Sequence, residues 1–445
     1  MAPSANSIGV YTRWRPLVQG EAKSGEINHT TKTGSGPLSS VSISGQASAV
    51  NKPWTSSPAF RAVFQPQDGN AAVYDSIAAP AISNIMRGGS SSFFAYGHSG
   101  SGKTHTIIGY DYDDDKQLGL CLAAARQLFE ELRPLNEGAG QELGIGFSLF
   151  ELRKKSAFDL LNNRTECHIR EGPDGKTHIR GETEMLEGGK VRVCPIVKRP
   201  CWDFESLKRQ LVEALGRRAV GSSSVHDQSS RTHAVLELEI INRDLVSARQ
   251  SVIDRQSELV PVGKRATDIS IEEQMKGIIK TPDGGWAPNP DYRMNQARID
   301  AAEAEKAACE AQVAAAESHV EDVLRASPSP CLGGRMVFVD LAGAEYHQEK
   351  GAPAQTMKQT PQERQEGRQI NADLLALKEV IRAWSKKQPR IPFRSSSLTM
   401  VLREHFTGLN DNSSAMIVTV SPARGQYAAT LNSLKYGSLV GASSG

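Results

Sequence analysis

The sequence lacks several features that would define its class. It has no apolar run near the ~20 residues that a membrane-spanning helix requires. Its first ten residues, MAPSANSIGV, contain no basic segment followed by an apolar core, so we expect no secretory signal. Its formal net charge is only +2, which gives no general attraction to nucleic acid. We therefore expect a soluble intracellular protein with no membrane span and no nucleic-acid partner.

Cysteine is also sparse. The six cysteines contain no CxxC pair, so neither a zinc site nor a disulfide framework is indicated, and a reducing cytosolic setting fits best. They are Cys121, Cys167, Cys194, Cys201, Cys309 and Cys331. At 445 residues the chain exceeds the usual size of a single domain, which predicts either two domains or one large domain with an insertion.

The segment SFFAYGHSGSGKTHT, residues 92–106, carries the clearest motif. Gly97 is followed, after four residues, by Gly102, Lys103 and Thr104, which is the phosphate-loop pattern. The apolar run before Gly97 predicts a buried strand, and a helix can begin after Thr104. In this context backbone N–H groups turn toward a phosphate, Lys103 reaches the outer phosphates, and the Thr104 hydroxyl binds Mg²⁺. A flexible Gly/Ser turn is the alternative, and four matching residues make it the poorer one.

Two later segments fit the same site. SSRTH, residues 229–233, begins a long predicted strand, and FVDLAGAE, residues 338–345, is an apolar strand that ends at Asp340. An aspartate at the carboxyl end of a buried strand is where P-loop NTPases hold the magnesium shell. Gly343 follows closely, and its bare backbone N–H can approach a γ-phosphate. Simple capping of a strand and a loop would explain each segment alone, but not their joint occurrence.

Periodicity and turn residues predict the remaining elements coarsely. We expect strands at 8–11, 144–151 and 232–242, and helices at 73–86, 118–132 and 204–218. Pro80 should split or kink the first of these helices. Residues 18–58 are rich in Gly, Ser and Thr and predict weak strands joined by exposed turns.

Residues 243–333 differ in character and predict an insertion. Repeated Pro and Gly between 261 and 290 predict a long loop over 243–293. Residues 294–326 contain neither Gly nor Pro and predict an alanine-rich helix. This helix either lies singly on the surface or pairs with a partner in a coiled coil, and its thin apolar seam, interrupted by Lys306, favours the first.

Together these motifs resemble the motor domain of the kinesin superfamily. The resemblance runs from residue 8 to about residue 437 outside the insertion, so that residues 1–445 would form one motor domain interrupted at 243–333. It rests on RWRP, AYGHSGSGKTHT, SSRTH and DLAGAE, followed by INADLLALKEVI, PFRSSSLT and LNSLKYG. It implies an α/β P-loop NTPase fold with a central mixed sheet of about eight strands and helices on both faces. It also implies an ATP-hydrolysing, microtubule-binding motor with ATP and Mg²⁺ as cofactors, located on the cytoskeleton in the cytoplasm.

The resemblance assigns a role to each motif residue. Arg13, Pro16 and His105 would contact the adenine. Ser230 would join Thr104 at Mg²⁺, to which Asp340 is linked. Ser229 and Gly343 would face the γ-phosphate, and Arg231 would bridge to Glu345 when ATP is bound. The residues that would hold the phosphates are Gly97, His98, Ser99, Gly100, Ser101, Gly102, Lys103 and Thr104.

Residues 346–410 form the predicted contact with microtubules. They contain eleven Lys/Arg and six Asp/Glu, including Lys378, Arg382 and Arg394, and such a basic face suits the acidic surface of tubulin. A solvated basic helix face would give the same pattern.

Some positions depart from the family pattern. His226 replaces an asparagine, Gly89 replaces a tyrosine, and Asp373 replaces a serine. Ser395 and Ser397 replace an acidic and a basic residue of the microtubule-facing motif. These changes leave a weakly active or non-motile microtubule-binding scaffold as the alternative function. A GTPase is a third candidate, but the chain has no guanine-reading NKxD motif.

Overall fold

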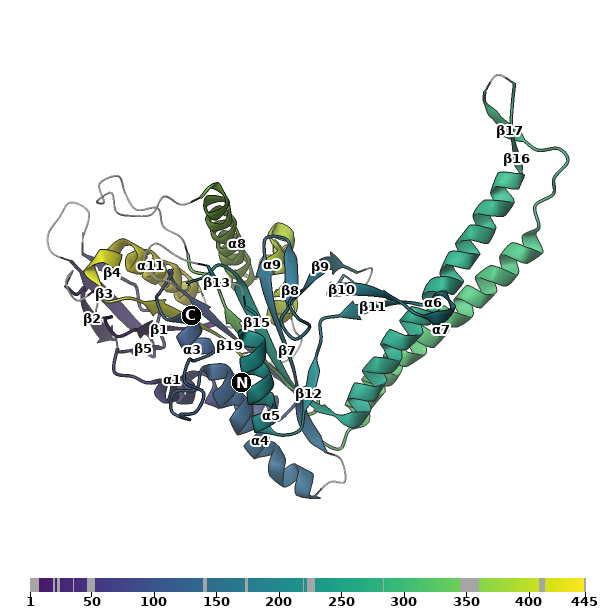
Figure 1. The fold of residues 1–445 in the computed structure, drawn as a ribbon. Coiled ribbons are helices and arrows are strands. Elements are labelled where there is room, and N and C mark those ends of the chain that lie inside the picture. The colour runs from purple at the N-terminus through teal and green to yellow at the C-terminus, as the bar shows by residue number, and fades with distance from the viewer. Residues whose placement is uncertain are drawn as a thin grey trace. The chain divides into compact units, whose positions relative to one another are not determined.

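The computed structural model describes residues 8–18, 21, 25–34, 36–45, 53–138, 142–172, 175–218, 220–221, 229–282, 284–344, 360–407 and 413–443 (Figure 1). They divide into two compact units. Unit 1 comprises Met1–Ile179, Ile196–Ile241 and Pro330–Gly445, and unit 2 comprises Arg180–Pro195 and Asn242–Ser329. None of the described helices combines the length and apolarity needed to cross a bilayer.

A mixed sheet forms the centre of unit 1. The strand order is β9-β8-β7-β15-β18-β6-β19-β1-β5, and β12 also pairs with β7. From β18 to β5 the strands are parallel, whereas β15 is antiparallel to β18 and β8 is antiparallel to both neighbours. The strands are β1 (Ile8–Trp14), β5 (Ala62–Phe64), β6 (Ser90–Tyr96), β7 (Leu143–Arg153), β8 (Ser156–Asp159), β9 (Thr165–Glu171), β12 (Arg199–Cys201), β15 (His233–Asn242), β18 (Arg335–Asp340) and β19 (Ser413–Val420).

The expected mixed sheet is confirmed, although it is larger than the eight strands implied by the resemblance. Antiparallel strands after β7 extend one edge through β10 (Thr177–Met185) to β11 (Val191–Pro195), and the whole sheet contains twelve strands. The boundary between the two units falls within β10.

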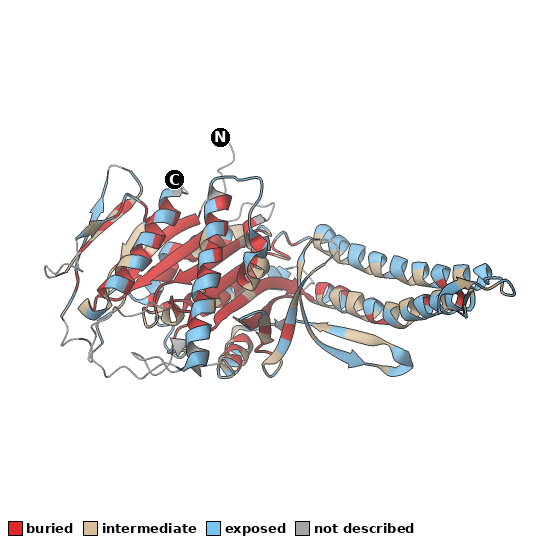
Figure 2. Ribbon diagram, turned by 90° about the horizontal axis from the view of Figure 1, so that it is seen from above, coloured by how far each residue is buried: buried red, intermediate tan, exposed pale blue. Residues whose placement is uncertain are grey.

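The sheet is buried on both faces, as β6 illustrates. Phe93 and Phe94 are adjacent and therefore point to opposite faces of the sheet. Phe93 stacks on Phe338 of β18 with ring centroids 5.1 Å apart, and Phe94 stacks on Phe406 at 5.8 Å. Both phenylalanines of β6 are buried, so helices must cover each side (Figure 2). This is why the strand before Gly97 is continuously apolar rather than alternating.

Two sets of helices provide this cover. In one set α3 packs on β6 and β18, and α4 packs on β7 and contacts α1, α2 and α5. In the other, α11 packs on β1 and β19, α8 contacts α11 and α9, and α10 packs on β6. The first set is α1 (Asn70–Ile77), α2 (Ala79–Ile85), α3 (Lys103–Ile107), α4 (Leu120–Gly138) and α5 (Phe204–Leu215). The second set is α8 (Pro361–Ser385), α9 (Ser397–Val401), α10 (Arg403–Thr407) and α11 (Tyr427–Ser443).

Several local predictions are confirmed in unit 1. Pro80 lies in the first turn of α2, so the predicted helix at 73–86 is divided into α1 and α2 as expected. The weak strands expected within 18–58 are β2 (Asn28–Thr33), β3 (Ser39–Ser44) and β4 (Trp54–Thr55), which form a separate three-stranded sheet. A short ribbon of β13 (Val220–Gly221) and β14 (Ser229–Ser230) lies just before β15.

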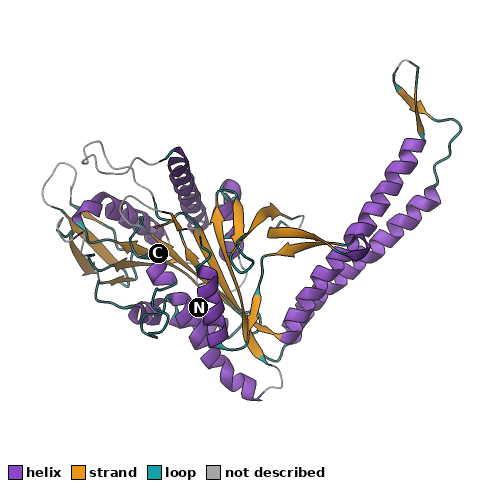
Figure 3. Ribbon diagram, viewed as in Figure 1, coloured by secondary structure: helices purple, strands orange, loops and turns teal. Residues whose placement is uncertain are grey.

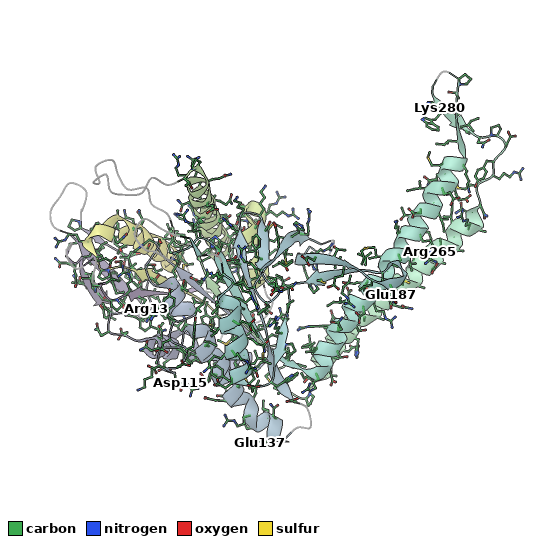
Figure 4. All side chains as sticks on the ribbon, viewed as in Figure 1. Arg13, Asp115, Glu137, Glu187, Arg265 and Lys280 are labelled. Atoms are coloured by element: carbon green, nitrogen blue, oxygen red, sulfur yellow. The ribbon has the colours of Figure 1, made fainter. Side chains whose placement is uncertain are left out.

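Unit 2 is built around a pair of long helices, α6 (Arg243–Lys276) and α7 (Gln296–Ala326), which pack against each other (Figure 3). A small ribbon of β16 (Ile278–Lys280) and β17 (Trp286–Pro288) connects them. In Figure 4, Arg265 marks α6 and Lys280 marks the ribbon. The predicted helix at 294–326 is confirmed. It packs against α6 of the same insertion, whereas the sequence predicted either a single surface helix or a coiled coil with a partner.

The loop expected over 243–293 is wrong, because α6 occupies most of it. Asn242 caps this helix by accepting a hydrogen bond from the Leu245 N–H at 2.8 Å. Pro261 lies inside α6, where a proline costs about 3 kcal/mol. Packing against α7 offsets this cost, and Ala266 of α6 and Ala302 of α7 are both buried.

Candidate nucleotide site

The phosphate loop lies between β6 and α3, as its motif predicts. Gly100 and Gly102 have φ angles of 71° and 102°, a left-handed conformation that glycine adopts without strain. A Cβ atom on Gly97 would lie 2.3 Å from the Thr419 carbonyl oxygen, so no larger residue fits there. The Ser101 hydroxyl is 2.7 Å from the Thr419 hydroxyl, which attaches the loop to β19. The loop is therefore held rigidly at the carboxyl end of the sheet.

Lys103 is the buried cation of this loop. Its Nζ donates a hydrogen bond to the His98 carbonyl oxygen at 2.8 Å. Burial lowers the pKa of Lys103 to about 8, and the positive charge of Arg218 acts in the same direction, whereas Asp340 opposes it. A buried ammonium with so little compensating charge favours binding of an anion, and a nucleotide phosphate supplies one.

Asp340 connects the second predicted motif to the phosphate loop. It ends β18 and lies opposite Ala95 of β6, so the register of the sheet brings it beside the start of α3. Its Oδ2 accepts hydrogen bonds from the Thr104 hydroxyl at 2.7 Å and from Arg218 Nη1 at 2.6 Å. Its Oδ1 is buried and has no hydrogen-bond partner within the described part of the chain. A carboxylate oxygen and a hydroxyl are hard ligands of the kind that Mg²⁺ prefers, so these residues fit a magnesium shell.

Arg218 contacts the candidate site through Asp340, although no sequence motif predicted it. It lies just after α5, and its Nη2 also donates to the Thr232 carbonyl oxygen at 3.1 Å. Its side chain is 6% exposed and that of Asp340 is 1% exposed, so the ion pair is shielded from water. Arg217 and Arg218 follow a helix, and no motif distinguishes this pair from ordinary basic residues at a helix end.

The second predicted motif also contacts the phosphate loop through its backbone. A Cβ atom on Gly343 would lie 2.6 Å from the Ser99 backbone nitrogen, so this glycine is required by close approach. The next residue, Ala344, donates its N–H to the Gly97 carbonyl oxygen at 3.1 Å. Glu345 lies outside the described residues, so its predicted bridge to Arg231 stays a prediction.

In the first motif the positions of Ser229 and Ser230 are described by their backbone alone, which pairs with β13. Arg231 Nη1 lies 4.0 Å from Glu366 Oε2 of α8, and Arg153 of β7 also forms an ion pair with Glu366. The side chain of Ser230 lies outside the described part of the structure, so its proximity to Thr104 stays a prediction. Arg231 lies near the Glu366 carboxylate, a neighbour that the motif did not indicate.

His233, at the start of β15, links the two motifs. Its Nδ1 accepts a hydrogen bond from the Ala342 N–H at 3.0 Å, and burial lowers its pKa to about 3. The ring is therefore neutral with its proton on Nε2, which lies 3.8 Å from Asp373 Oδ2 of α8. Burial raises the pKa of Asp373 to about 6, against a hydrogen bond from Gln369 that lowers it. Asp373, which replaces the serine of the family pattern, thus places a buried carboxyl group beside His233.

Of the residues predicted for the adenine, His105 lies in α3 and Arg13 contacts that helix. Arg13, which is labelled in Figure 4, is buried. Its Nη1 donates to the Thr106 hydroxyl at 2.8 Å. Pro16 is exposed and His105 is half-buried, and burial followed by the charge of Arg13 lowers the pKa of His105. Arg15, for which no role was predicted, donates to the Gly100 carbonyl oxygen at 2.7 Å and forms an ion pair with Glu21 at 2.6 Å.

The basic region 346–410 is only partly described, because residues 346–359 and 408–410 lie outside the described ranges. Arg382 is exposed on α8, whereas Lys378 is half-buried, with its Nζ 6.0 Å from the centre of the Tyr436 ring. Arg394 is 78% exposed and forms two hydrogen bonds to Glu171, at 2.7 and 2.9 Å. Of the three named basic residues, Arg382 and Arg394 therefore reach the surface fully.

Comparisons with known proteins agree with this architecture. The kinesin motor domain model matches residues 13–262 and 312–442. The rice "Kinesin-like protein KIN-13A" is 28% identical over 378 residues, which are 85% of this chain and 34% of that protein. The mouse "Kinesin-like protein KIF24" is 26% identical over 377 residues, 85% of this chain and 20% of that protein. The chain thus spans about a third or less of the length of these relatives.

A solved structure is similar across nearly the whole fold. It is the KIF14 motor dimer in its two-heads-bound state, with AMP-PNP and in complex with a microtubule. The match has a TM-score of 0.62 at 19% identity and covers 98% of this chain and 94% of that one. The phosphate loop, the hydrogen bond from Thr104 to Asp340 and the mixed sheet all agree with this match. Since the family model matches most of the sequence, this chain belongs to the kinesin motor domain family.

Proposed function

We propose that this chain is an ATP-hydrolysing motor domain that couples its nucleotide cycle to microtubule binding and movement. One observation carries the proposal: the buried Lys103 lies beside a Thr104 hydroxyl that is already hydrogen-bonded to Asp340. These are the groups that a phosphoryl-transfer site needs for charge neutralisation and metal binding.

The remaining residues have roles that follow from their places. Gly97–Thr104 would hold the phosphates, and Thr104 with Ser230 would bind Mg²⁺, which neutralises the charge that develops on the phosphates. Arg13, Pro16 and His105 would surround the adenine. The backbone of Gly343 already contacts the phosphate loop, so a γ-phosphate bound there would change the position of the 340–345 segment.

Hydrolysis would depend on closure of this segment. Ser229, Gly343 and the Arg231–Glu345 bridge would enclose the γ-phosphate and exclude bulk water. In the described structure Arg231 lies near Glu366 of α8, so forming the bridge would require it to change partner. This exchange would transmit the state of the nucleotide to α8.

The output surface would be the basic region 346–410, with Arg382 and Arg394 exposed for contact with acidic tubulin. We accordingly propose that the protein acts on the microtubule cytoskeleton in the cytoplasm. Ser395 and Ser397 replace an acidic and a basic residue of the family pattern, which supports a weaker contact with microtubules. A non-motile microtubule-binding scaffold is therefore the second candidate.

The test is ATP turnover by the purified chain with and without polymerised tubulin. Strong stimulation by microtubules supports the motor, and binding without stimulation supports the scaffold. A folded protein that shows neither turnover nor microtubule binding would refute both. Lys103→Ala is the matched control, because it should remove nucleotide binding and leave the fold intact.

A further inference from the structure

The far end of the helical hairpin in unit 2, residues 271–294, exposes many apolar side chains. This segment, which we call the tip, contains the end of α6, the β16–β17 ribbon and the residues that lead to α7. Fourteen large hydrophobic residues are exposed in the described part of the chain, and six of them lie in the tip. Apolar side chains gathered in this way mark a surface that contacts a partner. They are Ile271, Met275, Ile278, Ile279, Trp286 and Met294, with exposed fractions from 37% to 63%.

Hydrogen bonds within unit 2 give the tip a defined conformation. The buried Glu273 accepts hydrogen bonds from the Asn295 N–H at 3.0 Å and from Arg298 Nη1 at 2.8 Å. The Asn289 side chain donates to the Lys276 carbonyl oxygen at 3.1 Å. These bonds join the segment after β17 to the end of α6, so the ribbon between them is held at both ends.

The ribbon itself is an incomplete sheet. It has two strands, and a sheet of two strands is marginally stable in water. The Asn289 N–H donates to the Gly277 carbonyl oxygen at 2.8 Å, and the Thr281 N–H donates to the Gly285 carbonyl oxygen at 2.9 Å. Hydrogen-bonded and non-hydrogen-bonded pairs alternate along an antiparallel ladder. The residues next to these hydrogen-bonded pairs therefore direct their backbone groups away from the ribbon.

This alternation leaves one open edge. Ile278 and Lys280 of β16 belong to non-hydrogen-bonded pairs, so their N–H and C=O groups point away from β17. Trp286 and Pro288 are their partners on β17 and also point outward. Proline has no N–H to donate, so Pro288 interrupts the edge of β17. Of the two strands in the ribbon, β16 is the one that can accept a further strand.

The edge of β16 is complementary to itself. When two β16 strands pair antiparallel around a two-fold axis at Ile279, Ile278 of one copy lies opposite Lys280 of the other. Both of these pairs can exchange two backbone hydrogen bonds. The apolar stem of Lys280 then packs on an isoleucine, and the two lysines are diagonal rather than opposite. Ile279 faces its own equivalent across the axis, where side chains are closest.

The charge of the tip fits a second copy better than an acidic partner. The tip contains three basic and four acidic residues, a formal charge of −1. Its Lys276 already forms an ion pair with Glu272 at 2.6 Å. An anionic lipid surface or an acidic protein would attract an excess of basic residues, which the tip lacks. Two nearly neutral tips can approach each other without the cost of juxtaposed like charges.

We propose that the tip is an interface through which two copies of this chain associate, with their β16 strands paired antiparallel around Ile279. The pairing joins two marginal ribbons into one larger sheet and covers exposed isoleucine side chains of both copies. The interface lies in the insertion and uses none of the residues assigned to the nucleotide or to microtubules.

Sedimentation equilibrium of the whole chain tests the association. Because the interface is small, we expect a monomer–dimer equilibrium with a dissociation constant between about 1 and 100 µM. Ile279→Lys spares the monomer, since the residue is 43% exposed, but places two ammonium groups opposite each other in the dimer. It should weaken association by about tenfold or more. Ile271→Lys is the matched control on α6, outside the β16 edge, and should change association by less than about twofold.

Ile279→Cys gives an independent measurement. Across the proposed axis its Cα atoms would be about 4.5 Å apart, within the range of about 4.4–6.8 Å that a disulfide spans. Mild oxidation should therefore link Ile279→Cys into a covalent dimer. The wild type, which controls for the native cysteines, and Ile271→Cys should stay unlinked.

Several results would overturn the inference. They are a folded chain that remains monomeric up to about 500 µM, equal weakening by Ile279→Lys and Ile271→Lys, or no covalent dimer of Ile279→Cys. Sedimentation of a monomeric chain with vesicles of phosphatidylcholine and phosphatidylserine would show instead that the tip binds lipid. ATP turnover by Ile279→Lys should equal that of wild type, so failure of the inference leaves the proposed function intact.

Discussion

Asp373 gives the most direct quantitative prediction. The residue is 5% exposed and burial raises its pKa from 3.8 to about 6, so the ionised form is disfavoured in the folded protein. This difference in pKa between the unfolded and the folded protein corresponds to about 3 kcal/mol of stability. An acid whose folded pKa is raised stabilises the fold below its unfolded pKa, and this stability is lost as pH rises through the folded value. The window here runs from about pH 4 to pH 6.

Asp373→Asn removes the ionisable group and keeps an oxygen that can accept from Gln369 Nε2, now 3.0 Å from the carboxylate. The new amide N–H₂ needs partners in a buried place, which offsets part of the gain. We expect the variant to be more stable than wild type by about 2 to 3 kcal/mol at pH 7.5, and by about half of that at pH 5.

Urea denaturation of the nucleotide-free protein, followed by circular dichroism at both pH values, measures the two differences. Glu379→Gln is the control, because it makes the same change of charge on an exposed position of α8 and should shift stability by no more than about 0.5 kcal/mol. A variant that is less stable at pH 7.5, or equally stabilised at both pH values, would show that burial does not penalise the Asp373 carboxylate.

Three further substitutions test other contacts. Gly343→Ala places a methyl group 2.6 Å from the Ser99 nitrogen, so it should stop microtubule-stimulated ATP turnover. The affinity for a fluorescent ADP analogue should stay within about threefold of wild type. Arg218→Ala leaves Asp340 without its buried cation and should destabilise the nucleotide-free protein by about 3 kcal/mol, a loss that magnesium nucleotide partly restores in thermal denaturation. Glu273→Ala removes the acceptor for Arg298 and for the Asn295 N–H, so amide hydrogen exchange over residues 289–298 should accelerate while β6 is unaffected; unchanged exchange there would contradict the contact.

The parts of the candidate site that could be predicted from the sequence are those whose geometry is local. The phosphate loop is defined by consecutive residues from Gly97 to Thr104, and its strand and helix adjoin it directly. Asp340 could be predicted for a similar reason, since it ends an apolar strand. Arg218 carries no such mark, because its role depends on a residue 122 positions away. Only the folded sheet brings that pair together.

The helix α6 was missed for a different physical reason. Pro261 and Gly263 are poor helix residues, and propensity alone argued for a loop. Tertiary packing decided otherwise, because α7 supplies a partner surface along α6 and the connecting ribbon holds their ends together. The exposed side chains of α7 also explain why its own pattern showed only a thin seam: the contact with α6 needs small residues such as Ala302 rather than large ones.

The helical hairpin has a consequence for how the chain folds. It separates β15 and β18 in the sequence, although these two strands are paired in the sheet from Ala234↔Asp340 to Glu239↔Arg335. An unstructured connection of this length would cost about 2 to 3 kcal/mol more in closure entropy than a tight turn. Because α6 and α7 run out and back, forming the hairpin brings both strand ends together with contacts that are local in sequence. We expect the hairpin to form early and to speed the pairing of β15 with β18. The candidate nucleotide site depends on this pairing, because Asp340 ends β18.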